Sequence, residues 1–193
     1  DSEHSAIFQC LNNKNISNLD YITLTASGGP FLNTPLDQFK NIKPRDAINH
    51  PIWKMGQKIS VDSATMINKA LEIIEASVLF NLNGSQIDVV VHPEHIVHGL
   101  VHYKDGSTIA NLGLPDMITP ISVALNWPNR LDLNLTKMSL TNISKLSFFE
   151  PDLKKFPGLK LGWEALKSPY CSPVVLNASN EIAVDCFLKN KIQ

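Results

Sequence analysis

Two β-branched runs on either side of one long helical segment constrain the fold of this chain more than any other feature. Residues 21–25 (YITLT) and 87–91 (IDVVV) have the composition of strands, and the second run is continuously apolar, which is typical of a strand covered on both faces. Between them, residues 62–80 carry apolar side chains at helical spacing, with Asp62 or Ser63 available as the N-cap. Strand, helix and strand in this order predict a βαβ crossover.

A hairpin follows this unit. Residues 97–103 and 107–112 are predicted strands, and Asp105-Gly106 between them is a dipeptide that favours a tight turn. Because the hairpin is antiparallel and the crossover is parallel, the predicted fold is α/β, with a mixed sheet covered by helices. A short helix at residues 6–11, capped by Asp1 or Ser2, opens the chain.

The second half of the chain changes character after Arg130. Residues 131–152 have no strong period and are predicted to be a linker. Helical segments at 161–167 and 180–189 then indicate part of a small helical domain. The predicted organisation is a catalytic α/β domain at 1–130, the linker, and the start of a truncated C-terminal helical domain at 153–193.

Charge and composition exclude several classes of protein. The chain has 17 basic and 18 acidic residues, so no field of one sign favours nucleic acid or an anionic membrane, and any anion must be bound at a local site. No run approaches the roughly 20 apolar residues of a membrane span. Three widely spaced cysteines without a CxxC pair indicate a reducing compartment. The opening, which has neither an initiator methionine nor an apolar leader, suggests a piece of a longer protein.

The predicted helix at 62–80 has two different sides. Its apolar side consists of Ile67, Leu71, Ile74 and Val78. On the opposite side Asn68, Lys69 and Glu72 are three or four residues apart, so their side chains are neighbours and can converge on one ligand. The alternative is a solvated face with a local Lys–Glu pair.

Two places on the chain suit a phosphate. A helix start offers free N–H groups and a positive dipole end, and Ser63 there would add a hydroxyl beside the ammonium of Lys69. The turn Ser27-Gly28-Gly29 is built of small residues whose backbone amides can approach an anion closely. Such turns are common, so this one is equally an ordinary turn.

Carboxylates near the N-terminus suit a divalent cation. Asp1 and Glu3 flank Ser2, and two carboxylates this close repel each other unless a cation or solvent separates them. Magnesium uses a few carboxylates while substrate oxygens fill its other positions, and Glu72 would supply a third. The alternative is an acidic first turn favoured by the helix dipole.

Residues 30–56 show little regular structure, which is typical of a lid or binding loop inside a compact domain. Trp53 in this stretch can close over a ligand and exclude water, or it can fill the domain's own core. Four histidines between His92 and His102 raise the question of zinc, but no cysteine accompanies them and the spacing disfavours it.

Several strings of residues, taken in order, carry a family resemblance. DSEH, SGGPF, HPIWKMGQKISVDSATMINKALEIIEA, VHPEHIVHGLV, LGLPDM and LNASNEIAV closely resemble 1-deoxy-D-xylulose 5-phosphate reductoisomerase of the methylerythritol phosphate (non-mevalonate) isoprenoid pathway. The resemblance covers nearly the whole chain. It implies an N-terminal NADPH-binding Rossmann domain, a catalytic α/β domain, a linker and a C-terminal helical bundle, of which this chain looks like the middle and part of the end.

The resemblance also implies an activity. The family is an NADPH-dependent oxidoreductase and isomerase that uses Mg²⁺ or Mn²⁺, with Co²⁺ as an alternative, and converts the sugar phosphate 1-deoxy-D-xylulose 5-phosphate to 2-C-methyl-D-erythritol 4-phosphate. It implies a homodimer, cytoplasmic in bacteria or in a plastid-type organelle in eukaryotes. The chain alone is expected to be an inactive fragment, with a non-catalytic phosphate- or metal-binding fragment as the alternative and a magnesium-dependent phosphatase as a weaker third.

Individual roles follow by matching motifs. Metal binding falls on Asp1, Glu3 and Glu72. Catalytic roles fall on Glu72, Lys69, His50 and Asp1. Substrate binding, mostly around the phosphate, falls on Ser2, Ser27, His50, Trp53, Ser63, Asn68, Lys69 and His98, with Trp53 in a mobile flap. The positions that approach the nicotinamide are Met55, Gly56 and Met117. The visible departure from the family motifs is Ala26, where glycine is usual, and it bears only on the flexibility of the turn.

Overall fold

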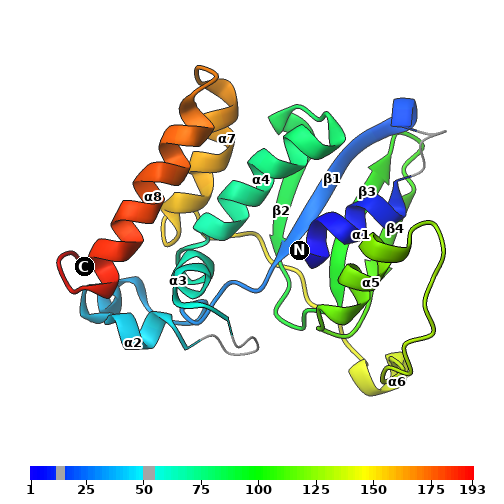
Figure 1. Ribbon diagram of the computed structural model, residues 1–193, viewed down its shortest axis with the longest axis horizontal. Helices are drawn as coiled ribbons and strands as arrows, with labels where there is room; N and C mark the ends of the chain where they lie inside the picture. Colours follow the sequence, from blue (N-terminus) through cyan, green and yellow to red (C-terminus); the bar gives the residue numbers. More distant parts are fainter. Residues whose placement is uncertain (12–15, 50–54) are drawn as a thin grey trace. The chain divides into compact units, whose positions relative to one another are not determined.

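The computed structural model describes residues 1–11, 16–49 and 55–193 (Figure 1). The chain divides into two compact units: unit 1 contains residues 1–25 and 85–150, and unit 2 contains residues 26–84 and 151–193. Each unit is therefore assembled from two stretches that are distant in sequence. None of the helices in the described part of the chain combines the length and apolar character that a membrane crossing requires.

Unit 1 is built on a four-stranded sheet in the order β2-β1-β3-β4. The strands are β1 (Leu19–Ala26), β2 (Ile87–Val91), β3 (Val97–Tyr103) and β4 (Thr108–Leu112). Strand β3 pairs antiparallel with both β1 and β4, with Leu24 opposite Gly99 and Leu100 opposite Ala110. The predicted strands and the predicted hairpin are confirmed, and Gly106 in its turn has a φ of 86° that glycine adopts without strain.

Helix α1 (Ser2–Cys10) packs on this sheet (Figure 1). Asp1 is its N-cap, as predicted, because the Asp1 carboxylate accepts a hydrogen bond from the backbone N–H of His4 at 2.6 Å. Ile7 is fully buried over β3, at the position of Gly99. A Cβ on Gly99 would lie 2.9 Å from Ile7 Cδ1, so only glycine lets helix and strand approach this closely. The smaller elements of unit 1 are η1 (Ile16–Asn18), η3 (Gly84–Gln86, which begins at the unit boundary), α5 (Ile118–Asn126) and α6 (Leu140–Ile143).

Residues 131–152, the predicted linker, have little regular structure besides α6 and are held to the sheet at their end. Val91 and Phe149 exchange two backbone hydrogen bonds, at 2.8 and 2.9 Å. Buried His92 reinforces this contact: its Nε2 accepts from the N–H groups of Ile96 and Val97, which leaves the ring proton on Nδ1 to donate to the Ser147 carbonyl at 2.8 Å. His92 therefore has a structural role rather than one in metal binding.

The prediction of a single helix at residues 62–80 is wrong. Unit 2 contains two helices here, α3 (Gln57–Thr65) and α4 (Ile67–Phe80), separated by Met66 in the left-handed conformation with φ 60° and ψ 12°. The Met66 side chain is almost fully buried, and this packing offsets a backbone cost of about 1 kcal/mol. Ser63 consequently lies in the last turn of α3 and not at a helix start.

The predicted apolar side of α4 is only partly buried. Ile67 is buried as predicted, but the other buried residues of this helix are Lys69, Ala70, Glu72, Ile73 and Ala76. Val78, which was assigned to the apolar side, is 76% exposed. The cause is helix α7 (Lys160–Lys167), whose Gly162 lies against the backbone of Ala70, where a Cβ would come within 2.6 Å of the Ala70 carbonyl oxygen. Close helix packing needs small residues at the crossing, and Ala70, Ala76 and Gly162 provide them.

The C-terminal residues complete unit 2 (Figure 1). Helix α7 is as predicted, whereas α8 (Ser172–Leu188) begins eight residues before the predicted start, because Pro173 fits the first turn of a helix instead of ending one. Residues 153–193 belong to the same compact unit as residues 26–84, so the units divide the chain differently from the predicted boundaries. The remaining elements are η2 (Leu36–Asn41), α2 (Pro44–Ala47) and η4 (Pro157–Leu159). The predicted α/β class with a helical C-terminal region is confirmed.

Candidate active site

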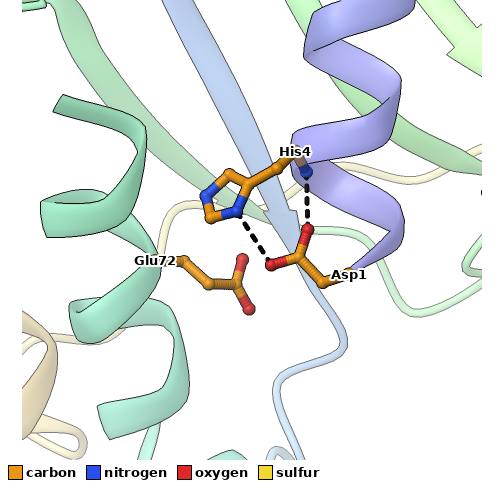
Figure 2. A group of neighbouring side chains, drawn as sticks. All are labelled: Asp1, His4 and Glu72. Carbon is orange, nitrogen blue, oxygen red and sulfur yellow. Dashed lines mark hydrogen bonds and ion pairs between the residues drawn. The ribbon is translucent and has the colours of Figure 1, made fainter. Parts of the chain in front are cut away.

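The head of α1 presents the first candidate residues. The Asp1 carboxylate uses one oxygen to cap the helix, and its other oxygen lies 3.0 Å from His4 Nδ1 (Figure 2). Asp1 is therefore the N-cap of the helix, and each of its oxygens still has a lone pair that a cation can use. His4 is not among the residues predicted for the site. Its spacing of three residues from Asp1 on a helix was the available signal, because that spacing places both side chains on one face.

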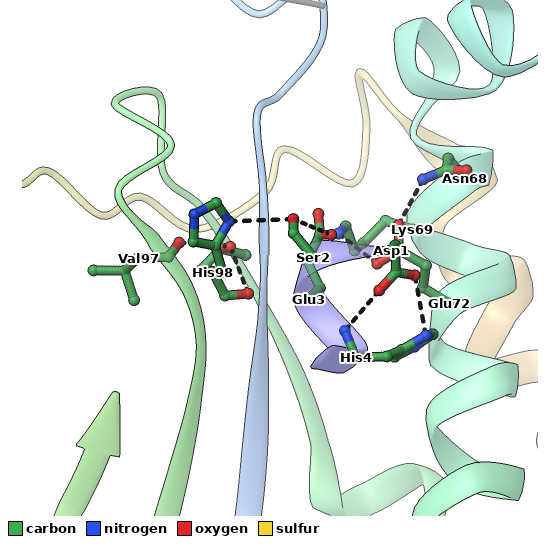
Figure 3. Close-up of polar contacts among 10 residues, drawn as sticks. Asp1, Ser2, Glu3, His4, Asn68, Lys69, Glu72, Val97 and His98 are labelled. Atoms are coloured by element: carbon green, nitrogen blue, oxygen red, sulfur yellow. Dashed lines mark hydrogen bonds and ion pairs between the residues drawn. The ribbon is translucent and has the colours of Figure 1, made fainter. Parts of the chain in front are cut away.

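Ser2 joins Glu3 to His98. The Ser2 hydroxyl donates to Glu3 Oε2 at 2.9 Å, and Ser2 Oγ lies 3.2 Å from His98 Nδ1 (Figure 3). His98 Nε2 lies 3.2 Å from the carbonyl oxygen of Gly113 and can donate its proton there. Burial lowers the pKa of His98, and the charge of Glu3 and the Gly113 carbonyl oppose this only in part. His98 is thus neutral at pH 7, and the single proton of Ser2 is shared between an imidazole nitrogen and a carboxylate.

In unit 2, the first two turns of α4 hold a buried carboxylate between two donors. Glu72 Oε1 accepts from Asn68 Nδ2, and Glu72 Oε2 accepts from Lys69 Nζ, each at 2.6 Å (Figure 3). The side chains of Lys69 and Glu72 are only 5% and 4% exposed. The predicted convergence of these three side chains is therefore observed, while the alternative of a solvated Lys–Glu pair is wrong. A buried ion pair is a weak source of stability, which favours a functional reason for it.

The Ser27 turn is pressed against the end of α3. Gly28 and Gly29 have φ values of 81° and 66°, and the Gly29 N–H donates to Ser27 Oγ at 3.0 Å. A Cβ on Gly29 would lie 2.7 Å from the carbonyl oxygen of Ser63. The glycines are thus required both by the backbone conformation and by this close approach. Two predicted phosphate-binding segments, the Ser27 turn and the last turn of α3, are in contact within unit 2.

The other predicted site residues are less defined. His50 and Trp53 lie outside the described residues. Met55 and Gly56 precede α3, and the Gly56 carbonyl accepts from the hydroxyl of Ser60 at 2.9 Å. Met117 precedes α5 in unit 1 and is partly exposed. The assignment of these residues to a nicotinamide stays a prediction.

Two family models match the chain. Residues 1–80 match the model described as 1-deoxy-D-xylulose 5-phosphate reductoisomerase C-terminal domain. Residues 112–193 match the model described as DXP reductoisomerase C-terminal domain. The two matches do not overlap, and together they account for most of the sequence.

Curated relatives and solved structures agree with the family models. The 1-deoxy-D-xylulose 5-phosphate reductoisomerase of Ruthia magnifica is 56% identical over 192 residues, and that of Prosthecochloris aestuarii is 53% identical, in each case over 100% of this chain and 50% of the relative. A crystal structure of DOX-P reductoisomerase in complex with NADPH, fosmidomycin and magnesium is 47% identical, with a TM-score of 0.94 over 100% of this chain and 50% of that one. The enzyme of Zymomonas mobilis in complex with NADPH is 45% identical, with a TM-score of 0.92 over 100% of this chain and 49% of that one. The chain spans about half the length of these relatives, and it belongs to the 1-deoxy-D-xylulose 5-phosphate reductoisomerase family.

Proposed function

We propose that the protein containing this chain is an NADPH- and metal-dependent reductoisomerase that converts 1-deoxy-D-xylulose 5-phosphate to 2-C-methyl-D-erythritol 4-phosphate. The observation that carries the proposal is the buried Glu72 carboxylate, which is hydrogen bonded to both Asn68 and Lys69. These are the residues that the family resemblance assigns to the metal and to the substrate phosphate. A crystal structure of a related DOX-P reductoisomerase in complex with NADPH, fosmidomycin and magnesium supports the choice of cofactors.

The candidate metal ligands fit a hard divalent cation. Asp1, Glu3 and Glu72 are all carboxylates, and oxygen donors of this kind suit Mg²⁺ or Mn²⁺, with Co²⁺ as an alternative. Glu72 Oε1 accepts from Asn68 and Glu72 Oε2 accepts from Lys69, and because a carboxylate oxygen has two lone pairs, these hydrogen bonds are compatible with coordination of a cation. We assign these three residues together to one metal ion. When bound, the ion would act as a Lewis acid toward the carbonyl and hydroxyl oxygens of the substrate.

The phosphate group would be held by donors from unit 2. Lys69 supplies an ammonium, Asn68 an amide, and Ser63 and Ser27 supply hydroxyls. Contacts to a phosphate that does not react provide binding energy that positions the carbons that do react.

The remaining residues act around the reacting carbons. Ser2 Oγ and His98 Nδ1 lie 3.2 Å apart, and both groups are suited to hold the substrate's hydroxyl groups. We assign His50 to substrate binding and catalysis, and Trp53 to closure over the substrate. Met55, Gly56 and Met117 are assigned to the nicotinamide side, where NADPH supplies the hydride and the protein supplies orientation and exclusion of water.

Substitution of two residues in the full-length protein tests the proposal. Glu72→Gln and Lys69→Ala are each expected to lower kcat/KM by about 10²-fold or more, because one removes a metal ligand and the other a phosphate contact. The readout is substrate-dependent NADPH oxidation with Mg²⁺. Glu75→Gln, an exposed carboxylate on the same helix, is the matched control and should leave turnover near normal. Near-normal turnover in both test variants would overturn the residue assignments.

A non-catalytic phosphate- or metal-binding fragment is the second candidate, because the chain spans only half the length of its relatives. The 193-residue chain alone is expected not to oxidise NADPH in the presence of substrate and Mg²⁺. Release of inorganic phosphate from the sugar phosphate without NADPH would favour a phosphatase instead.

The proposed assembly and compartment rest on the family. We propose a homodimer, which light scattering of the full-length protein tests, and a cytoplasmic location in a bacterial cell or a plastid-type organelle in a eukaryote.

A further inference from the structure

A network of charged and polar groups centred on one buried carboxylate joins α3 to α8 within unit 2. Asp62 on α3 is only 1% exposed. Its Oδ2 lies 2.7 Å from Lys58 Nζ, and its Oδ1 accepts a hydrogen bond from Asn180 Nδ2 on α8 at 2.8 Å. Lys58 Nζ also lies 3.4 Å from Glu181 Oε1. Both oxygens of a buried carboxylate are thus satisfied, one by an ammonium group and one by an amide.

The four residues come from two of the family motifs. Lys58 and Asp62 belong to the string HPIWKMGQKISVDSATMINKALEIIEA, and Asn180 and Glu181 belong to LNASNEIAV. The second string has received no role in binding substrate, metal or cofactor. The network gives it one, because it connects residues that are 118 positions apart and that match two different family models.

Stability alone is a poor explanation for this network. Removing a carboxylate from water is costly, and an apolar pair of similar volume would hold two helices together at least as well. The Lys58 ammonium group stays charged: burial would lower the pKa of Lys58, but the hydrogen bonds and charges of Asp62 and Glu181 outweigh this and raise it. Directional bonds differ from apolar contacts in that they fix the rotation of a helix about its axis.

The rotation of α3 matters because of what α3 carries. Lys58 is in its first turn and Asp62 one turn later, so the network holds the helix at two successive turns. Ser63 directly follows Asp62, and its carbonyl oxygen meets the Ser27 turn at Gly29. A change in the rotation of α3 would therefore move the Ser63 hydroxyl and the surface on which the Ser27 turn rests.

We propose that Asp62 is a positioning residue, and that the network of Asp62, Lys58, Asn180 and Glu181 sets the rotation of α3 so that Ser63 and the Ser27 turn match the phosphate of the substrate. This inference rests on the proposed function, since it takes the phosphate site from there. The network touches no reacting atom, so its loss weakens phosphate binding more than it slows the chemical step.

The test uses the full-length protein and three variants. Asp62→Asn removes the charge, Asn180→Ala removes the amide donor but leaves the ion pair with Lys58, and the exchange Asp62→Asn/Asn180→Asp restores a carboxylate–amide bond with its partners reversed. Asp185→Asn is the matched control, because Asp185 is a 54% exposed residue on α8 that pairs only locally with Lys189. Each variant is measured for its affinity for inorganic phosphate and for Mg²⁺ by calorimetry, for kcat and KM with the sugar phosphate, and for its thermal unfolding midpoint.

Asp62→Asn is expected to weaken phosphate binding and to raise KM about tenfold, which corresponds to loss of one hydrogen bond to a charged group, while kcat falls less than about threefold. Asn180→Ala should also weaken phosphate binding and raise KM, each by about threefold. Mg²⁺ affinity should stay the same in all variants, the exchange should recover most of the phosphate affinity, and Asp185→Asn should behave like the unaltered protein.

Unchanged phosphate affinity in folded Asp62→Asn and Asn180→Ala would overturn the inference. So would an equal loss of phosphate and Mg²⁺ affinity, or an exchange variant without recovery, since both indicate a purely structural role. If Asp62→Asn does not fold, Asn180→Ala carries the test. Failure of the proposed function looks different: the unaltered protein would bind phosphate in a manner that depends on Asp62 and yet oxidise no NADPH.

Discussion

Glu72 accepts one hydrogen bond on each carboxylate oxygen, from Asn68 and from Lys69, at the same distance of 2.6 Å. In an environment that excludes water, the ammonium of Lys69 is the main compensation for the buried negative charge. A cation bound to Glu72 would compete with Lys69 for that charge, while a phosphate bound to Lys69 would release Glu72 for the cation. The residues proposed for the metal and for the phosphate are therefore energetically linked through one short stretch of helix.

A double-mutant cycle measures this link. Lys69→Met should lower the free energy of unfolding by about 3 kcal/mol, because it leaves an uncompensated buried carboxylate, and adding Glu72→Gln should restore most of the loss. Urea unfolding monitored by circular dichroism is the measurement. Lys189→Met, which breaks an exposed pair with Asp185, is the control and should leave the free energy of unfolding nearly unchanged. Additive losses in the double variant would show that the two side chains do not compensate each other.

The surroundings of His102 predict how the stability of the protein depends on pH. Its ring stacks on Tyr21 at 4.1 Å, and its two nitrogens lie 2.9 Å from the hydroxyls of Thr23 and Thr108. Burial lowers its pKa, and the carboxylates of Asp88 and Asp20 oppose this only in part. The unfolded chain therefore binds a proton at higher pH than the folded chain does, and stability must fall as pH drops through the ordinary histidine pKa.

The free energy of unfolding, measured in urea, is expected to fall between about pH 7.5 and about pH 5.5, and His102→Asn should make this dependence shallower. Burial also lowers the pKa of His98, so part of the pH dependence of stability should remain in the His102→Asn variant. A slope that is the same in both proteins would refute the contribution of His102.

At the scale of elements, the contact between α1 and β3 depends on the absence of a side chain. Gly99 leaves room for Ile7 and Ala6, whose side chains would lie 2.9 and 3.3 Å from a Cβ at this position. The contact matters for function because α1 carries Asp1, Ser2 and Glu3 at its head. A helix pushed away from the sheet would displace all three.

Gly99→Ala is accordingly expected to lower the free energy of unfolding by about 1–3 kcal/mol through overpacking, and to weaken Mg²⁺ binding in the full-length protein. Gly113→Ala is the control, since a Cβ there would meet His98 Nε2 at an ordinary 3.6 Å. Chemical denaturation and magnesium titration are the measurements. A fully stable Gly99→Ala variant would show that α1 can shift at no cost.

At the scale of the whole molecule, neither compact unit is contiguous in sequence. Residues 1–25 complete unit 1 only together with residues 85–150, and residues 26–84 complete unit 2 only together with residues 151–193. A ligand that binds only the native state adds to the stability of the folded protein.

Magnesium should therefore stabilise the full-length protein through Glu72. Saturating Mg²⁺, about 100 times its dissociation constant, should raise the free energy of unfolding by about 2.7 kcal/mol, measured by urea unfolding. In Glu72→Gln most of this increase should disappear. An undiminished increase in Glu72→Gln would show that Glu72 does not bind the ion.

Local chemistry made part of this protein predictable from its sequence. The four strand segments, the Asp105-Gly106 turn and the Asp1 cap depend on side chains within a few residues of each other, and the structure contains them. The motifs that indicated the reductoisomerase family did so because residues that bind a phosphate or a metal have few acceptable replacements. The convergence of Asn68, Lys69 and Glu72 followed from helical spacing alone.

Tertiary structure decided the rest. The break at Met66, the burial of Lys69 and Glu72, and the early start of α8 all depend on which partner a segment packs against, and the partners lie far away in the sequence. A left-handed residue or a buried charge is unfavourable by itself and persists only where its surroundings compensate for it. For the same reason no local pattern could show that Asn180 on α8 reaches Asp62 on α3, because that hydrogen bond exists only once the two helices have packed.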